Sequence, residues 1–377
     1  MKKTFQVQKV LMIIILFTLS FARSEAANRF AVGSGNWDGS IWASTAGGTA
    51  GSASTPTSAD VVTINANEIV TVNIAASVKS ITINGSLIFS GNRDLTIANK
   101  GSLVINNGAG VEFSAGGIIK GGGNNANGIL VTINAGAALM TANPQGFVTG
   151  TGNTALTGSI AIKPGNRGAP DYDNAIHYTF NGTASQVTGN AVSNATTLTI
   201  SNTAEVSATN DLIVSTLVTA AGSILDMGIN TLSAGTVNHS GGLLTGNTTL
   251  SPIPAGKTWG GSVAFNSSSA QTIVDGSYND LDGSGGNRTL STTDTIGVAG
   301  VFIPGTGSYT VINSVFDFNG DTEQVIPVFT FDDLVMSNAG IKKIQAGILV
   351  NCQTVTVDED ASVEVNADGG GRLNVLD

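Results

Sequence analysis

The stretch SITINGSLIFSGNRDLTIANKGSLVINNGAGVEF, from Ser80 to Phe113, alternates short apolar runs with Asn and Gly and carries few charges. Apolar residues at every second position indicate short β-strands, and Asn and Gly accept the positive φ that sharp bends require. Ile64, Ile83 and Ile105 lie 19 and 22 residues apart, each within a T-I-N or V-I-N run. That spacing fits one coil of three strands and three bends, in which equivalent residues stack about 4.8 Å apart. The sequence therefore predicts an all-β fold, a right-handed parallel β-helix (β-solenoid) with imperfect repeats, in which Ile lies over Ile inside and Asn over Asn at a bend.

The composition agrees with this fold class. The 377 residues include 49 Gly, and only 11% are charged and 6% aromatic. Such a mixture favours strands and tight turns over helices. A repeat fold of this length need not divide into compact domains. The single Cys352 cannot form an intramolecular disulfide, so we expect it to be a small buried apolar residue and the stability to come from strand stacking.

Residues 1–26 have the pattern of a Sec-type signal peptide. Lys2, Lys3 and Lys9 precede the apolar run Val10–Phe21, and Ser24-Glu25-Ala26 supplies small residues at the cleavage site. Twelve apolar residues are too few to span a bilayer, and no Cys follows them as a lipoprotein would require. We therefore expect cleavage after Ala26 and a secreted or cell-surface protein.

The mature chain is predicted to be acidic. Loss of residues 1–26 leaves 12 basic and 25 acidic residues, a net charge of −13. Such a surface repels nucleic acid and anionic lipid, so neither is expected as a partner. No later segment has the length or hydropathy of a transmembrane span, so no membrane span is expected in the mature chain.

Residues 27–59 are predicted to cap the solenoid, and residues 60–162 to form its first coils. The cap segment carries Trp37 and Trp42 in a G-x-W…W pattern ahead of a Gly/Ser/Thr-rich loop. Aromatic residues at the start of a solenoid commonly cover the open end of its core. The alternative interpretation is that the two rings stack against a carbohydrate.

Residues 179–377 are predicted to continue the solenoid through three F-N-G-x-x-x-Q repeats. Phe180, Phe265 and Phe318 each precede a Gln by six residues. We expect the Phe to lie in the core and the Gln at a turn. The copies are 85 and 53 residues apart, and the longer interval is interpreted as an extra coil or loop at 239–261. Separate β-sandwiches are the structural alternative, but 53 residues are few for an immunoglobulin-like unit of about 100.

Residues 163–178 interrupt the strand pattern and are predicted to form a surface loop, the position where a rigid fold commonly carries binding groups. Asp171, Asp173 and His177 form the best candidate catalytic cluster, and Lys163 or Arg167 could supply a base. The alternative is a loop stabilised by Asx turns without chemistry. Trp259, expected to be exposed, is a third candidate binding aromatic beside Trp37 and Trp42.

Evidence for a cofactor in the sequence is weak. The segment Asp317–Asp321 (DFNGD) lacks the distal Glu of a calcium loop, so a corner turn is expected there. The consecutive Asp358, Glu359 and Asp360 would not all face one way in a strand. His239 has no second ligand at metal spacing, so no zinc site is expected. Ca²⁺ is therefore the one possible cofactor, and no other metal is predicted.

The N-terminal pattern G-x-W, W, P-x-x-x-D, VVTI, IVTVN, followed by SITINGSLIF, resembles the start of secreted cell-surface β-helix proteins common in Bacteroidota. The F-N-G-x-x-x-Q repeats are similar to repeat arrays in the same exported proteins. The resemblance implies type IX secretion cargo, whose members usually end in a C-terminal sorting domain. No such domain is recognised here, and the chain stops at DGGGRLNVLD, which resembles the opening of another coil.

Two functional hypotheses follow. The first is a non-enzymatic exported protein, an adhesin-like or structural β-solenoid at the cell surface or outside the cell, with an unidentified glycan or protein partner. It depends on the leader, the repeats and the lack of a polar constellation. The second is a glycan-binding or glycan-cleaving β-helix, similar to polysaccharide lyases, acting through Asp171, Asp173 and His177.

Overall fold

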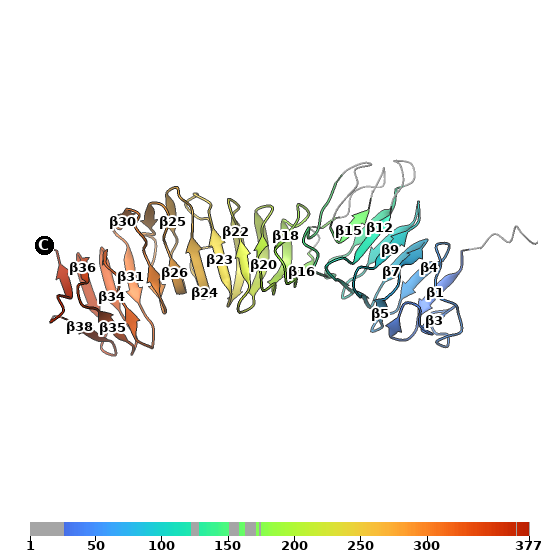
Figure 1. Cartoon of the computed structure of the whole chain (residues 1–377), viewed down its shortest axis with the longest axis horizontal. Coiled ribbons are helices and arrows are strands. Elements are labelled where there is room, and N and C mark those ends of the chain that lie inside the picture. The colour runs from blue at the N-terminus through green and yellow to red at the C-terminus, as the bar shows by residue number, and fades with distance from the viewer. Residues whose placement is uncertain are drawn as a thin grey trace, which may run out of the picture.

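The computed structural model describes residues 26–121, 128–150, 158–162, 171–172, 175–366 and 368–376. Its regular structure is entirely strand, and the strands stack in parallel as a β-solenoid of about 15 turns. Figure 1 shows an elongated rod that runs from β1 and β3 at one end to β36 and β38 at the other. The predicted all-β solenoid is confirmed. Within the described residues, no helix is long and apolar enough to cross a membrane.

In the first block, each coil after the first contributes one strand to each of three faces, whereas the strands Asn28–Ala31 and Trp42–Ala43 of the first coil both lie on the first face and pair antiparallel. The first face contains β3 (Trp42–Ala43), β1 (Asn28–Ala31), β4 (Val61–Ile64), β7 (Ser80–Ile83), β10 (Ser102–Ile105) and β13 (Leu130–Ile133). The second face contains β2 (Gly35–Asn36), β5 (Ile69–Val72), β8 (Ser86–Phe89), β11 (Gly110–Phe113) and β14 (Ala138–Thr141). The third contains β6 (Ala76–Val78), β9 (Asp94–Ile97), β12 (Ile118–Gly121) and β15 (Ile160–Ile162).

The second face continues without interruption into the later half of the chain. Pairing runs from β14 to β16 (His177–Phe180), β18 (Asn194–Ile200), β20 (Leu212–Thr219), β22 (Leu232–His239) and β24 (Lys257–Phe265). It then proceeds through β26 (Gly276–Asp282), β28 (Ile296–Val298), β31 (Val315–Phe318), β34 (Asp333–Met336) and β37 (Thr354–Val357). The later half therefore extends the same solenoid and does not form separate β-sandwiches.

The remaining strands of the later half lie on the other sides of the coils. Beside the long face lie β17 (Gln186–Val187), β19 (Val206–Ser207), β21 (Ile224–Asp226), β23 (Gly242–Thr245) and β29 (Phe302–Ile303). Three further sheets contain β25 (Gln271–Ile273), β27 (Arg288–Leu290) and β30 (Tyr309–Thr310); β32 (Gln324–Val325), β35 (Ile341–Ile344) and β38 (Ser362–Val365); and β33 (Phe329–Thr330), β36 (Leu349–Cys352) and β39 (Arg372–Val375). Cys352 is buried, as expected.

The stacking predicted from the opening stretch is present. Ile64 pairs with Ile83 and Ile83 with Ile105, and all three side chains are buried. At the following bend, Asn106 Nδ2 donates to Asn84 Oδ1 at 2.6 Å, and the Nδ2 of Asn134 donates to Asn106 Oδ1 at 2.7 Å. Each coil thus places an aliphatic side chain on its equivalent inside and an amide on its equivalent at the corner.

The F-N-G-x-x-x-Q copies occupy two different corners, and the extra coil predicted in the longer interval is present, because His239 pairs with Trp259 and the residues between them form one complete coil. Strand register places Phe180 and Phe318 in one inward stack, together with Ile200, Thr219, His239, Trp259, Tyr278 and Val298. Phe265 instead pairs with Thr245, in the next stack around the coil. The intervals are unequal for two reasons: four coils separate Phe180 from Trp259 but three separate Trp259 from Phe318, and the middle copy begins at Phe265, one corner beyond Trp259.

Each Gln of these copies is buried and joins two coils at a corner. The Gln271 Oε1 accepts the N–H of Ser267 at 2.9 Å, and its Nε2 donates to the carbonyls of Thr245 and Asn247 in the preceding coil, both at 2.8 Å. Gln186 and Gln324 make the same three bonds at their own corners. The amide therefore satisfies backbone groups that a corner removes from the strand ladder.

We predict that Gln271→Leu destabilises the protein by about 3 kcal/mol or more, because three buried backbone groups would lose their partners at roughly 1–3 kcal/mol each. Urea unfolding followed by circular dichroism measures the change. The matched control is Gln353→Leu, at an exposed position, for which we expect a change within about 0.5 kcal/mol. Equal stabilities of the two variants would contradict the role assigned to the corner amide.

Candidate functional site

The N-terminal tryptophan pair closes the end of the core. Trp37 and Trp42 are both completely buried, and their rings meet edge to face with centroids 5.0 Å apart. The Nε1 of Trp42 donates to the Trp37 carbonyl at 2.7 Å. The pair has no free face for a sugar ring, so the carbohydrate-stacking alternative is wrong and the capping interpretation is supported.

Trp259, expected to be an exposed binding aromatic, is also completely buried, so that expectation is wrong. It lies on β24 directly beside His239 of β22, and the two rings meet edge to face at 5.4 Å. The reason is the strand register, which directs this position of each coil into the core.

His239 is a buried neutral imidazole. Its Nδ1 accepts the N–H of Gly261 at 3.2 Å, which places the ring proton on Nε2. Neither that Nε2 nor Trp259 Nε1 has a hydrogen-bond partner. Burial lowers the pKa of His239 to about 4. Its role is therefore packing in the neutral form.

The polar cluster predicted at 163–178 is described only in part. Lys163, Arg167 and Asp173 lie outside the described residues. Asp171 is exposed, and His177 is half-buried as the first residue of β16, so this strand starts before the end of the segment expected to be a loop. Of the three candidate catalytic residues, the structure therefore describes Asp171 and His177.

The carboxylates considered for Ca²⁺ have other arrangements. Both carboxylate oxygens of Asp317 lie within hydrogen-bond distance of the Ser337 hydroxyl, at 2.9 and 2.8 Å, and burial raises the pKa of Asp317. Asp358 and Asp360 lie in an exposed turn between β37 and β38. Among the described residues, no group of three or more His, Cys, Asp or Glu side chains is arranged to hold a metal ion.

A different feature stands out in the later half, where the backbone ladder is interrupted. β28 pairs with β31 on the long face, so the coils are adjacent there. On the other sides, the sheet β25-β27-β30 ends at β30, while the sheets that begin with β32 and β33 extend only toward the C-terminus. Across residues 175–366, all of which are described, no strand pairing joins β29 to β32 or β30 to β33. Two consecutive coils are therefore joined by strand pairing on the long face and by the Gln324 amide at the next corner, but have no strand pairing on the other faces.

Aromatic rings fill the core at this interruption. Phe302 lies 4.6 Å from Phe316 and 5.3 Å from Phe329, between ring centroids, and Phe329 lies 4.8 Å from Tyr309 and 4.6 Å from Phe331. Such pairs contribute about 0.5–1.5 kcal/mol each beyond their area burial. Ring packing thus replaces the missing backbone bonds in holding the two coils together.

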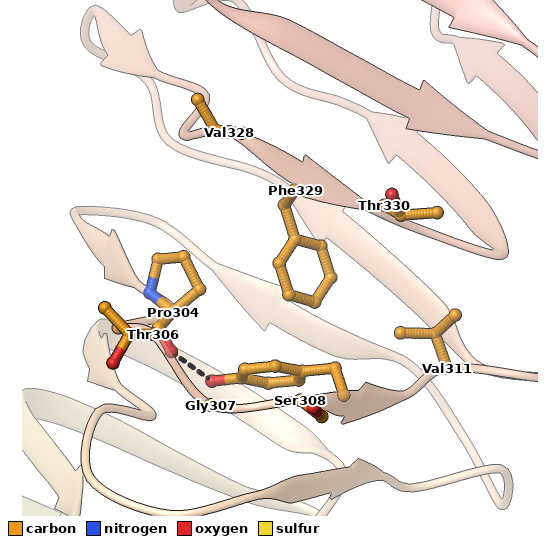
Figure 2. A pocket seen from close by; sticks show the side chains of 10 residues that line it. Pro304, Thr306, Gly307, Ser308, Val311, Val328, Phe329 and Thr330 are labelled. Atoms are coloured by element: carbon orange, nitrogen blue, oxygen red, sulfur yellow. Dashed lines mark hydrogen bonds between the residues drawn. The ribbon is translucent and has the colours of Figure 1, made fainter.

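A cleft of about 440 Å³ opens where β30 and β33 separate. One wall is the turn and strand 304–309, and the other is 328–330. Figure 2 shows Phe329 pointing into the cleft, with Pro304 and Thr306 on the opposite side and Val328 at the rim. The cleft has the size of a small-ligand pocket, which is typically about 300–1,000 Å³.

The cleft is uncharged, although a buried cation lies close to it. None of its lining residues carries a charge. Arg288, which pairs with Tyr309, is buried and directs its guanidinium at backbone carbonyls, including those of Ser267 at 3.0 Å and Asn287 at 2.9 Å. The Tyr309 hydroxyl lies 3.1 Å from the Gly283 carbonyl and 2.9 Å from that of Pro304, and burial raises the pKa of Tyr309. Both polar groups are therefore bonded at the corner, and the cleft is lined by uncharged side chains, including the hydroxyl residues Thr306, Ser308 and Thr330, and by backbone.

No protein-family model matches this chain, and no curated protein or solved structure shows significant similarity to it. Sequence reasoning missed the cleft. Its one local signal is the segment IPGTGSYT at 303–310, whose Pro and two Gly predict a turn. The next coil does not pair with this segment. Whether two strands pair depends on both segments, so neither stretch alone predicts the cleft.

We predict that the neutral state of His239 gives the protein an acid-sensitive stability. Because its folded pKa of about 4 lies below the ordinary 6.5, the contribution is present above pH 6.5 and is lost as the pH falls toward 4, at up to about 1.4 kcal/mol per pH unit. His239→Asn keeps an acceptor for Gly261 without titrating. The difference in unfolding free energy between wild type and variant should change over this window, and a constant difference from pH 7 to 4 would contradict the prediction.

Proposed function

We propose that this protein is an exported, non-enzymatic β-solenoid that acts at the cell surface or outside the cell as an adhesin-like or structural rod. The observation that carries the proposal is the uninterrupted parallel pairing of the long face from β5 to β37. About 15 coils at about 4.8 Å each give a rod on the order of 70 Å long. A rod of this kind holds a binding surface at a distance from its point of attachment.

Three further features support an extracellular role. The leader pattern at 1–26, which lies almost entirely outside the described residues, has the basic, apolar and small-residue order of a secretory signal. The chain has a single Cys, so no incorrect intramolecular disulfide can form in an oxidising compartment. The resemblance to surface β-helix proteins of Bacteroidota points the same way, and type IX secretion is part of this proposal.

The export step is tested with Ile14→Lys, which places a charge in the centre of the apolar run. We expect the exported fraction of the full chain to fall by roughly tenfold or more, because a Lys there costs about 2.5–3.5 kcal/mol on insertion scales. Cell fractionation and mass spectrometry of the N-terminus of the exported protein provide the measurement. Ile14→Leu is the control and should be exported and cleaved after Ala26. Export of the lysine variant at the control level would contradict the proposal.

The competing glycan-active function is tested with a glycan-array screen of residues 27–377, with and without Ca²⁺. We expect no saturable binding and no cleavage of any glycan. Binding or turnover that Asp171→Ala or Asp173→Ala abolishes, with the circular dichroism spectrum unchanged, would replace the non-enzymatic proposal by the polysaccharide lyase-like one.

A further inference from the structure

We infer that the cleft between β30 and β33 is an acceptor site for an extended, uncharged polypeptide segment of a partner protein, which binds as an added β-strand. The inference gives the rod proposed above a class of partner, and it rests on that proposed function only for its biological setting. Its physical basis is the interrupted ladder, which leaves strand edges of β30 and β33 open beside the continuous long face.

The open edges can be assigned to particular backbone groups. Arg288 N–H donates to the Ser308 carbonyl, so the groups of Ser308 and Thr310 face β27 and those of Tyr309 face the cleft side. The Phe331 N–H donates to the Asn351 carbonyl, so Thr330 and Val328 direct their groups away from β36, also toward the cleft side. These assignments follow because successive residues of a strand direct their N–H and C=O groups to opposite neighbours. The backbone of an extended ligand segment would form hydrogen bonds with these groups, which no described strand of this chain pairs.

The side chains around the cleft favour apolar residues at alternate positions of the ligand. Val328 is 59% exposed at the rim, and Ile312, just beyond β30, is 68% exposed. Ile303 and Val325, on the neighbouring interrupted face, are 48% and 43% exposed. Val328 is thus an exposed aliphatic side chain in the lining of the cleft, where an apolar residue of a bound segment would cover it.

Charge and geometry narrow the choice of partner. With no charged lining residue, the cleft offers no counter-ion for an acidic or basic ligand. A sugar would need an exposed aromatic face, but the Tyr309 and Phe329 rings pack against each other and Phe329 is only 8% exposed. A second copy of the chain is disfavoured because the strands of its described coils are already paired within the solenoid.

The test uses the purified chain 27–377 and a fluorescein-labelled peptide pool, acetyl-Thr-X-Thr-X-Thr-X-Lys-amide, with X restricted to Val, Ile, Leu and Phe. Fluorescence anisotropy should show saturable binding. The same pool with N-methyl groups on alternate residues keeps the side chains but loses backbone donors on one edge. We expect it to bind at least about tenfold more weakly, which corresponds to about 1.4 kcal/mol.

Two variants locate the site. Thr330→Pro removes the N–H that faces the cleft side while leaving the bonds to β36, and we expect roughly tenfold weaker peptide binding. Thr330→Ala is the matched comparison, because it loses the same side chain but keeps that N–H, and we expect it to bind the peptide roughly tenfold more tightly than Thr330→Pro does. Circular dichroism checks that both variants fold.

Several outcomes would overturn the inference: no binding of the pool, equal binding of the N-methylated pool, or equal binding by the two variants. Self-association of the chain that Thr330→Pro removes would reassign the cleft to a second copy, and oligosaccharide binding lost with Tyr309→Ala would reassign it to a glycan. Because the assay uses purified protein, it is independent of export. Failure of secretion would leave the acceptor site standing, and failure of peptide binding would leave the exported rod standing.

Discussion

The structure depends on the backbone hydrogen bonds between successive coils. Each coil is too short to bury its own apolar face, so it is stable only when the next coil pairs with its strand edges and covers its inward side chains. The Ile64, Ile83 and Ile105 stack shows the result, because equivalent residues must share size and shape to lie over one another at the strand spacing. This requirement explains why charges are scarce, since like charges in register would repel each other along the rod.

At each corner the bend turns backbone N–H and C=O groups away from the strand ladder. Side chains that reach from one coil to its neighbour supply hydrogen bonds at these corners. The side chain of Asn106 hydrogen-bonds to the equivalent Asn side chains in the coils before and after it. The Gln271 side chain donates hydrogen bonds to two backbone carbonyls of the preceding coil. Arg288 does the same with a charged group, and its burial lowers its pKa. Polar residues inside this protein are thus linkers between coils, which accounts for their burial without chemistry.

At the interruption between β30 and β33, stacking changes its physical basis. Between the coil that ends with β30 and the coil that ends with β33, one face remains hydrogen-bonded and aromatic rings hold the rest. Ring packing is less demanding about register than a backbone ladder, so the two coils separate and open a cleft. A functional surface can therefore arise in a repeat fold from a local failure of the repeat. It needs no inserted domain or catalytic loop.

The sequence by itself determined the solenoid, the inward Ile stack and the Asn ladder, because these depend on a periodicity that each coil repeats locally. It also placed the Phe of each F-N-G copy in the core and the Gln at a turn. Only the tertiary structure decided that Trp259 is buried, that Phe265 lies at a different corner from Phe180 and Phe318, and that β30 and β33 fail to pair. The physical reason is register: which residues stack depends on the length of every intervening loop, and a shift of one residue reverses the face that a side chain occupies. The spacing of residues along one chain reveals the period of such a fold, but it does not reveal where the strands of consecutive coils fail to pair.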